Sequence, residues 1–123
     1  MSNDKDNNLA PEMGDQAWRS QKPDAHYFEP TYSGALSFLR RPYSRDFNGV
    51  DVAVSGIPYD GAVTYRPGCR LGPRAIRAAS VQLAELDAFP FGFALSDYLS
   101  VVDAGDVVLN PHDPSTIFDA IYR

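Results

Sequence analysis

VSGIPYDGAVTYRPGCRLGPRAIRAAS, residues 54–80, decides the fold, because it joins a β-branched run to an amphipathic run through a loop dense in glycine, proline and arginine. Glycine permits positive φ angles and close approach of the backbone, whereas proline fixes φ, so such residues hold a loop to one path. The set that does so here is Gly56, Pro58, Gly61, Pro67, Gly68, Gly72 and Pro73. The stretch predicts a strand, a constrained loop and a helix with Pro73 at its first position, where proline is favoured.

Two apolar runs predict strands on either side of this helix. GVDVAVSGIP, residues 49–58, predicts a strand buried on both faces, and YLSVVDAGDVVL, residues 98–109, predicts a second buried strand with a valine-rich body. The body of the second strand is Val101, Val102, Val107 and Val108. The helix between them is predicted to run to about Asp87 with the apolar stripe Ile76, Ala79, Leu83 and Leu86. This order implies a βαβ unit with parallel strands and a right-handed crossover.

Shorter helices are predicted at the two flanks. Residues 34–40 form one, ended by Pro42, with apolar side chains on one side: Leu36, Phe38 and Leu39. In NPHDPSTIFDAIYR, residues 110–123, Asp113 can cap the free N–H groups of a helix and Pro114 suits its first position. The apolar stripe of that helix is Ile117, Phe118, Ile121 and Tyr122.

The chain divides into an arm and a part of a domain. Residues 1–30 show no helical or alternating apolar period, which predicts a flexible N-terminal arm. The remaining residues, 31–123, hold two predicted strands, and a two-stranded parallel sheet cannot cover its own faces and edges. We therefore expect residues 31–123 to be the incomplete N-terminal part of a larger α/β domain.

Composition excludes several classes of protein and site. The net charge of −5 argues against nucleic acid as a partner, because duplex binding needs a basic face. There is no apolar run of about 18 residues, the length that crosses a bilayer. Cys69 is the only cysteine, which excludes an internal disulfide and the common cysteine-based zinc sites. We expect a cytoplasmic protein without a membrane or nucleic-acid partner.

The loop after Pro58 is the candidate binding region, because ligands of parallel α/β sheets collect at the carboxyl ends of strands. Its candidate substrate-loop residues are Asp60, Arg66 and Arg70. From the residues alone, the loop is either a rigid turn with solvated arginines or an anion site formed by two arginines and the N-terminus of the helix at 73–87. We interpret Cys69 as a small apolar filler rather than a nucleophile.

The sequence GIPYDGAVTYRPGCRLGPRAIR, residues 56–77, resembles the N-terminal signature of the ureohydrolases, the agmatinase and arginase relatives that hydrolyse guanidino groups to urea. VVDAGDV at 101–107 is similar to the family's second strand, and SGALSFLRRPY at 33–43 to the lead-in of bacterial agmatinases. The likeness covers roughly residues 32–109. It implies the N-terminal portion of a three-layer α/β/α parallel-sheet (arginase-like) domain, taken from an agmatinase-type hydrolase that is a homo-oligomer when complete.

The resemblance also implies a pair of Mn²⁺ ions, which would lower the pKa of a bridging water and aim it at the guanidinium carbon. The family's metal motifs, Gly-Gly-Asp-His, Asp-Ala-His-x-Asp and Asp-x-Asp-x-x-Asp-Pro, all lie downstream of the matched region. Asp24, Ala25 and His26 spell the start of one motif, but Phe28 stands where that motif has aspartate, and His112 fits a turn ahead of a helix. We therefore assign no catalytic or metal residue here and expect the 123-residue chain alone to be inactive.

Because the likeness runs closest to agmatinases, the expected substrate is a small guanidino compound, agmatine, which would give putrescine and urea in polyamine metabolism. Guanidinobutyrate or a related guanidino acid is the alternative substrate. In this interpretation residues 60–70 shape the rim of the active site, and Asp60 is the group that faces a cationic substrate. A non-catalytic α/β binding or assembly module is the alternative of another class.

Asp103 and Asp106 flank Gly105 at the end of the second predicted strand, where a carboxylate pair could act in acid/base chemistry. The family comparison favours a structural role for both residues instead. Our hypothesis is that Arg77 tethers the helix to the sheet through one of these carboxylates.

Overall fold

The structure is a computed structural model that describes residues 31–84 and 86–123. The predicted arm, residues 1–30, lies outside the described residues. Strands and α-helices follow the predicted order: β1 (Val52–Gly56), α1 (Gly72–Ser80), β2 (Val101–Asp106) and α2 (Ile117–Tyr122). Short 3₁₀ helices lie between them: η1 (Phe38–Arg40), η2 (Cys69–Leu71), η3 (Val81–Leu83), η4 (Leu95–Asp97) and η5 (Pro114–Thr116). No helix in the described part of the chain is long and apolar enough to cross a membrane.

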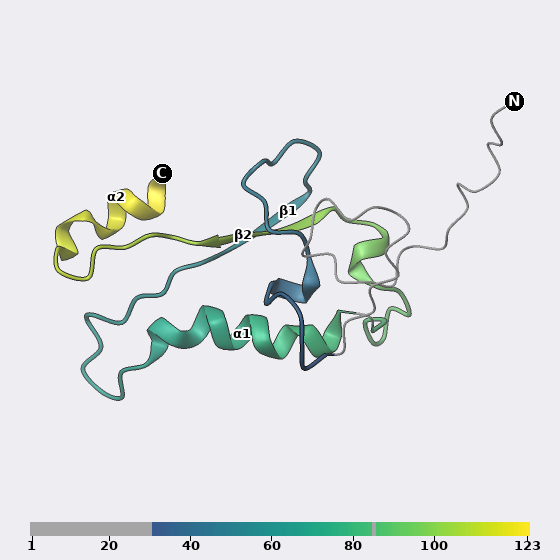
Figure 1. The fold of residues 1–123 in the computed structure, drawn as a ribbon, viewed down its shortest axis with the longest axis horizontal. Coiled ribbons are helices and arrows are strands. Elements are labelled where there is room, and N and C mark those ends of the chain that lie inside the picture. The colour runs from purple at the N-terminus through teal and green to yellow at the C-terminus, as the bar shows by residue number, and fades with distance from the viewer. Residues whose placement is uncertain (1–30, 85) are drawn as a thin grey trace, which may run out of the picture.

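The two strands pair in parallel, as predicted (Figure 1). Val52 lies opposite Val101, and Gly56 lies opposite Asp106. The register shifts between Val54 and Ser55, so the pair contains one irregularity. Both strands therefore end at the same edge of the sheet, and the loop that follows Gly56 lies at that edge.

A short turn joins α1 to the strands. Figure 1 shows α1 running beside the strand pair with η1 between them. The Phe38 N–H donates to Oδ2 of Asp103 in β2 at 2.8 Å, and the Leu39 N–H donates to Oγ of Ser80 in α1 at 2.9 Å. The helix of residues 34–40 that the sequence predicted is therefore wrong. Its N–H groups bind the sheet and α1, and only the three residues of η1 turn, with Leu39 and Arg40 at φ 49° and 52°.

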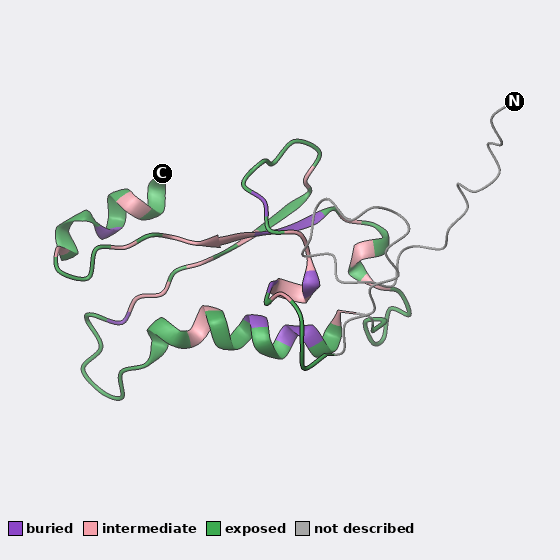
Figure 2. Ribbon diagram, in the orientation of Figure 1, coloured by how far each residue is buried: buried purple, intermediate pink, exposed green. Residues whose placement is uncertain are grey.

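The burial predicted for β1 is also wrong. Val52 is 37% exposed, and every residue of the strand is exposed or half-buried. The described residues place a helix against one side of the pair, and two strands cannot shield each other's faces. Buried residues gather instead at the start of β2, in η1 and along the side of α1 that faces the strands (Figure 2). The buried apolar residues are Val81, Val101, Val102 and Ile117.

The helix α1 is shorter than predicted and buries a different face. It ends at Ser80 and continues as η3, whereas the sequence predicted a helix to Asp87. Ile76, Leu83 and Leu86, three members of the predicted apolar stripe, are each 59% exposed. The buried residues of α1 are Arg77 and Ser80. The contacts described below explain this outcome, because α1 meets the strands through polar groups.

The C-terminal part keeps the predicted cap but not the predicted helix length. Oδ1 of Asp113 accepts from the Ser115 N–H at 3.2 Å, which confirms Asp113 as the capping residue. The first turn is the 3₁₀ helix η5, and α2 follows it. Ile117 is buried, but Phe118 and Tyr122 are exposed, so only the start of the predicted stripe is covered. Val108, assigned to the second strand, lies beyond β2 and is 83% exposed.

Candidate functional site

The candidate site is the loop of residues 57–71, which we call the rim loop. It follows β1 at the carboxyl edge of the strand pair and returns to α1 through η2. Residues 61–70 are all exposed, whereas Asp60 at the base of the loop is buried. Open α/β sheets bind ligands outside the carboxyl ends of their strands, so the rim loop occupies the expected position for a binding segment.

Asp60 closes the rim loop on itself. Its Oδ2 accepts from the Gly68 N–H at 2.7 Å and from the Arg70 N–H at 3.4 Å, and its Oδ1 accepts from Arg70 Nε at 2.6 Å. Burial acts to raise the pKa of Asp60, but these donors outweigh burial and hold the pKa below its ordinary value. The Asp60 carboxylate is therefore ionised and fully engaged inside the loop.

The tip of the rim loop has an unusual backbone. Gly68 has φ 137°, a region that is open to glycine, and Arg66 has φ 55°, which is uncommon for a residue with a side chain. The Arg66 guanidinium lies 5.2 Å from the centre of the Tyr65 ring, within the range of a cation–π contact. Strained backbone clusters at sites that handle ligands. The cation that the loop presents to solvent is Arg66, beside the 59% exposed side chain of Arg70.

A second cluster fixes α1 to β2. Arg77 Nε donates to Asp103 Oδ2 at 2.7 Å and Nη2 donates to Asp103 Oδ1 at 2.9 Å. Arg77 Nη1 donates to Asp106 Oδ1 at 2.7 Å. Asp103 also accepts from the N–H groups of Phe38 and Gly105, each at 2.8 Å. These contacts confirm that Arg77 tethers the helix to the sheet and that both aspartates are structural.

The charges of this cluster stabilise one another. Hydrogen bonds to Asp103 raise the pKa of Arg77, against the opposing effect of burial, and Asp106 adds to the rise. Burial acts to raise the pKa of Asp103, but Arg77 and the N–H donors of Phe38 and Gly105 hold that pKa below its ordinary value. Burial and the Asp103 charge together raise the pKa of Tyr43, whose hydroxyl donates to the Leu36 carbonyl oxygen.

Gly56 and Ser80 each join separate segments of the chain, and only Gly56 had a sequence signal for such a contact. A Cβ on Gly56 would lie 2.1 Å from Asp106 Oδ1 and 2.6 Å from Pro73 Cβ, so β1, β2 and the start of α1 meet at this position. Ser80 Oγ donates to the Arg77 carbonyl oxygen at 2.8 Å and accepts from the Leu39 N–H. The glycine at the end of a β-branched run signalled a close approach, but no local pattern marks a serine that joins two segments.

The remaining sequence candidates lie apart from these clusters. Cys69 is exposed, so it does not fill apolar space in the described residues as the small apolar filler that we expected. The Asp24 to His26 motif lies outside the described residues, and His112 lies in an exposed turn where its N–H donates to Asn110 Oδ1. Among residues 31–84 and 86–123, no group of three or more His, Cys, Asp or Glu could hold a metal ion. These residues do not provide the ligand set that a manganese pair requires.

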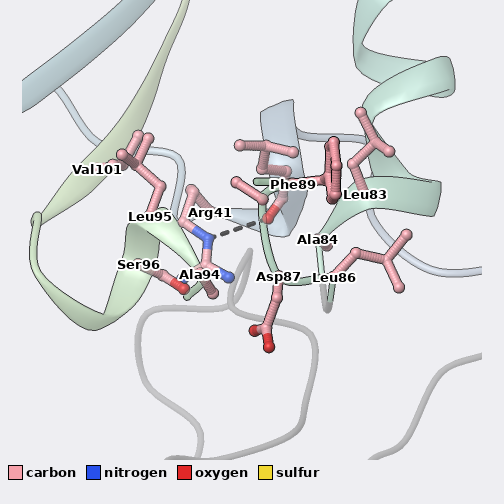
Figure 3. Close-up of a pocket in the computed structure, with 12 residues that line it drawn as sticks. Arg41, Leu83, Ala84, Leu86, Asp87, Phe89, Ala94, Leu95, Ser96 and Val101 are labelled. Atoms are coloured by element: carbon pink, nitrogen blue, oxygen red, sulfur yellow. Dashed lines mark hydrogen bonds between the residues drawn. The ribbon is translucent and has the colours of Figure 1, made fainter. Parts of the chain in front are cut away.

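A mostly apolar pocket of about 310 Å³ lies at the other end of the strands, where Val101 begins β2 (Figure 3). Arg41 extends into it, and Arg41 Nε donates to the Leu39 carbonyl oxygen at 2.9 Å. Burial lowers the pKa of Arg41, partly offset by the Asp97 charge. Because the strands are parallel, this pocket and the rim loop lie at opposite ends of the pair. The pocket is therefore separate from the candidate site.

Comparisons with known proteins found relatives that match most of this chain. The chain is 57% identical over 108 residues to the agmatinase of Chromobacterium violaceum, an alignment that covers 88% of this chain and 34% of the relative. The chain thus spans about a third of the length of this curated relative. It is also 40% identical over 101 residues to the proclavaminate amidinohydrolase of Streptomyces clavuligerus, covering 80% of this chain and 31% of that protein.

Solved structures match in the same region. The crystal structure of a hypothetical agmatinase from Burkholderia thailandensis superimposes with a TM-score of 0.78 and 54% identity, covering 88% of this chain and 34% of that one. These neighbours confirm the predicted arginase-like α/β fold. The sequence model of the arginase family matches residues 50–123, which include the rim loop and the Arg77 cluster. With more than half of its length matched, the chain belongs to the arginase family.

Proposed function

We propose that this chain is the N-terminal part of an agmatinase-type ureohydrolase, which hydrolyses a C–N bond of agmatine and releases putrescine and urea. The observation that carries the proposal is the 57% identity to an agmatinase over a region that includes the whole rim loop. Two relatives whose names denote hydrolysis of a guanidino or amidino group share this region. The reaction class is thus supported more strongly than the choice of substrate.

In this proposal the described residues serve as a scaffold and a substrate rim. The Arg77 cluster locks α1 against the carboxyl end of β2, where Asp106 ends the strand. The rim loop projects from the same edge and is held by Asp60. The metal ligands implied by the family resemblance have no counterpart among the described residues, so we assign them to the part of the relatives that this chain does not span.

A chimaera tests the proposal. It joins residues 1–123 of this chain to the part of the Chromobacterium violaceum relative that lies beyond the aligned region. Loaded with Mn²⁺, the folded chimaera is expected to release urea from agmatine. The intact relative is the positive control, and its rate of urea release is the reference for the chimaera. A folded chimaera that releases no urea from any guanidino compound, beside an active intact relative, would contradict the proposal.

A guanidino acid such as guanidinobutyrate is the second candidate substrate, and one observation favours it. The only carboxylate among rim-loop residues 57–71 is Asp60, which is turned inward and paired with Arg70. Arg66 is exposed at the tip of the same loop. A loop that presents a cation favours an anionic group at the far end of a substrate over the amine of agmatine.

A further inference from the structure

The position of Asp60 is at odds with a role as the group that receives a cationic substrate. Its side chain is 1% exposed, although the ten residues after it are all exposed. Three donors from Gly68 and Arg70 occupy its two oxygens at 2.6–3.4 Å. A substrate ammonium group would have to displace the Arg70 guanidinium and expose the carboxylate before it could bind there.

The same contacts give Asp60 a different role. They join position 60 to positions 68 and 70, so the Asp60 carboxylate closes the base of the loop. The backbone carbonyl oxygen of Asp60 also accepts from the Val63 N–H at 3.2 Å. The residues between, 61–67, are exposed and contain no helix or strand. Their path includes Arg66 at φ 55°, a conformation that persists in a non-glycine residue when the surroundings enforce it, and it ends at Gly68 at φ 137°.

We propose that Asp60 is a positioning residue: it holds the rim loop, through Gly68 and Arg70, in the shape that receives the guanidino substrate, and it does not itself contact the substrate. This inference rests on the proposed function and assigns a role within that site. It replaces our sequence-based hypothesis that Asp60 faces a cationic substrate.

The two roles predict different effects of an Asp60 substitution on activity towards different substrates. A direct ion pair with the ammonium group would make Asp60→Asn harmful to agmatine and neutral or helpful for guanidinobutyrate. A positioning residue affects every substrate that the loop receives, because the loop itself changes shape. Misplacement of a binding group by about 1 Å lowers turnover by about a hundredfold, so we expect kcat/KM to fall about tenfold to a hundredfold for both substrates.

The experiment uses the chimaera with agmatine and with guanidinobutyrate as separate substrates. Asp60→Asn and Arg70→Ala are each expected to lower kcat/KM for both substrates by similar factors. The double variant is expected to lose little more kcat/KM than Asp60→Asn alone, because both substitutions remove the same contact between Asp60 and Arg70. Asp119→Asn, which changes an exposed aspartate of α2 away from the loop, is the matched control and is expected to keep full activity.

Amide hydrogen exchange supplies a readout that does not depend on turnover. Asp60→Asn is expected to speed exchange at residues 61–70 while the melting temperature of the chimaera stays within a few degrees of the unsubstituted protein. A loss confined to agmatine, or unchanged exchange in the loop, would overturn the positioning role. If the unsubstituted chimaera releases no urea from either substrate, the proposed function fails and this inference fails with it.

Discussion

Arg77 in α1 and Asp103 in β2 form a two-pronged ion pair, with nitrogen–oxygen distances of 2.7 and 2.9 Å and side chains that are 7% and 0% exposed. A helix that meets a sheet in this way is held by directional contacts rather than by an apolar stripe. The pair also fixes η1, because Asp103 accepts from the Phe38 N–H. Arg77 and Asp103 therefore link three segments of the described chain: η1, β2 and α1. Arg77 also binds Asp106, which lies opposite Gly56 of β1.

The first prediction is that Arg77→Ala lowers stability before it affects catalysis. Removing one member of a buried ion pair leaves the other charge unpaired, which costs about 3–5 kcal/mol. In the chimaera we expect a lower denaturation midpoint, measured with urea, and a correspondingly lower melting temperature. Arg74→Ala, which changes an exposed arginine of the same helix, is the control and should change little. An Arg77→Ala protein that melts at the original temperature but has lost turnover would assign Arg77 to catalysis instead.

The second prediction concerns acid. The pKa of Asp103 is lower in the folded state than its ordinary value, so the ionised carboxylate contributes stability at neutral pH. That contribution falls once the pH drops below the ordinary aspartate pKa, about 3.9, towards the lower folded value. We expect the denaturation midpoint to decline as the pH falls below about 4, and we expect Asp103→Asn to start from a lower midpoint and to decline less. If Asp103→Asn loses stability at low pH as steeply as the unsubstituted protein, other groups control the acid sensitivity.

These contacts show which parts of the structure could be predicted from the sequence. The order of strands and helices, the parallel pairing and the Asp113 cap follow from local patterns, and each is confirmed. The Arg77 tether could be predicted as well, because an arginine beside the apolar stripe faces aspartates that end a neighbouring strand.

The burial of individual side chains could not be predicted in the same way. Periodicity placed Ile76 on the covered face of α1, but the neighbouring Arg77 occupies that face, where it pairs with Asp103 of β2. The contacts of Asp60 in the candidate site could not be predicted from the sequence either. Composition showed an acid in an arginine-rich loop, but only the fold of the loop reveals that Arg70 and Gly68 already occupy it.

The third prediction is that Gly56→Ala disrupts the meeting point of β1, β2 and α1. The added Cβ would lie 2.1 Å from Asp106 Oδ1 and 2.6 Å from Pro73 Cβ, and the proline ring is not a flexible neighbour. Overpacking of this kind costs about 1–3 kcal/mol, which chemical denaturation of the chimaera would measure. Gly72→Ala is the matched control, because nothing lies within 4 Å of a Cβ placed at Gly72. Equal stability of the two variants would argue against the close approach at Gly56.

The fourth prediction separates the two candidate substrates. If Arg66 meets a substrate carboxylate, Arg66→Ala lowers kcat/KM for guanidinobutyrate about tenfold or more, because a hydrogen bond to a charged group contributes about 1.5–3 kcal/mol. Agmatine carries no carboxylate, so its kcat/KM should stay level or rise. Arg74→Ala again serves as a control, since it removes the same charge outside the loop. Equal losses for both substrates would remove the support that Arg66 gives to an acid substrate.

The last prediction is that residues 1–123 alone release no urea from agmatine above background, even with Mn²⁺ present. A manganese pair needs several carboxylates and imidazoles that converge on the ions. Among residues 31–84 and 86–123 no such group exists, and the two carboxylates nearest the carboxyl edge of β2, Asp103 and Asp106, are already bound to Arg77. Freeing them would break the contact that holds α1 to the strands, so metal binding there would compete with folding. The assay follows urea with the chimaera as the positive control and the chain without metal as the blank. Mn²⁺-dependent urea release by the isolated chain would show that it assembles a site that the described residues do not contain.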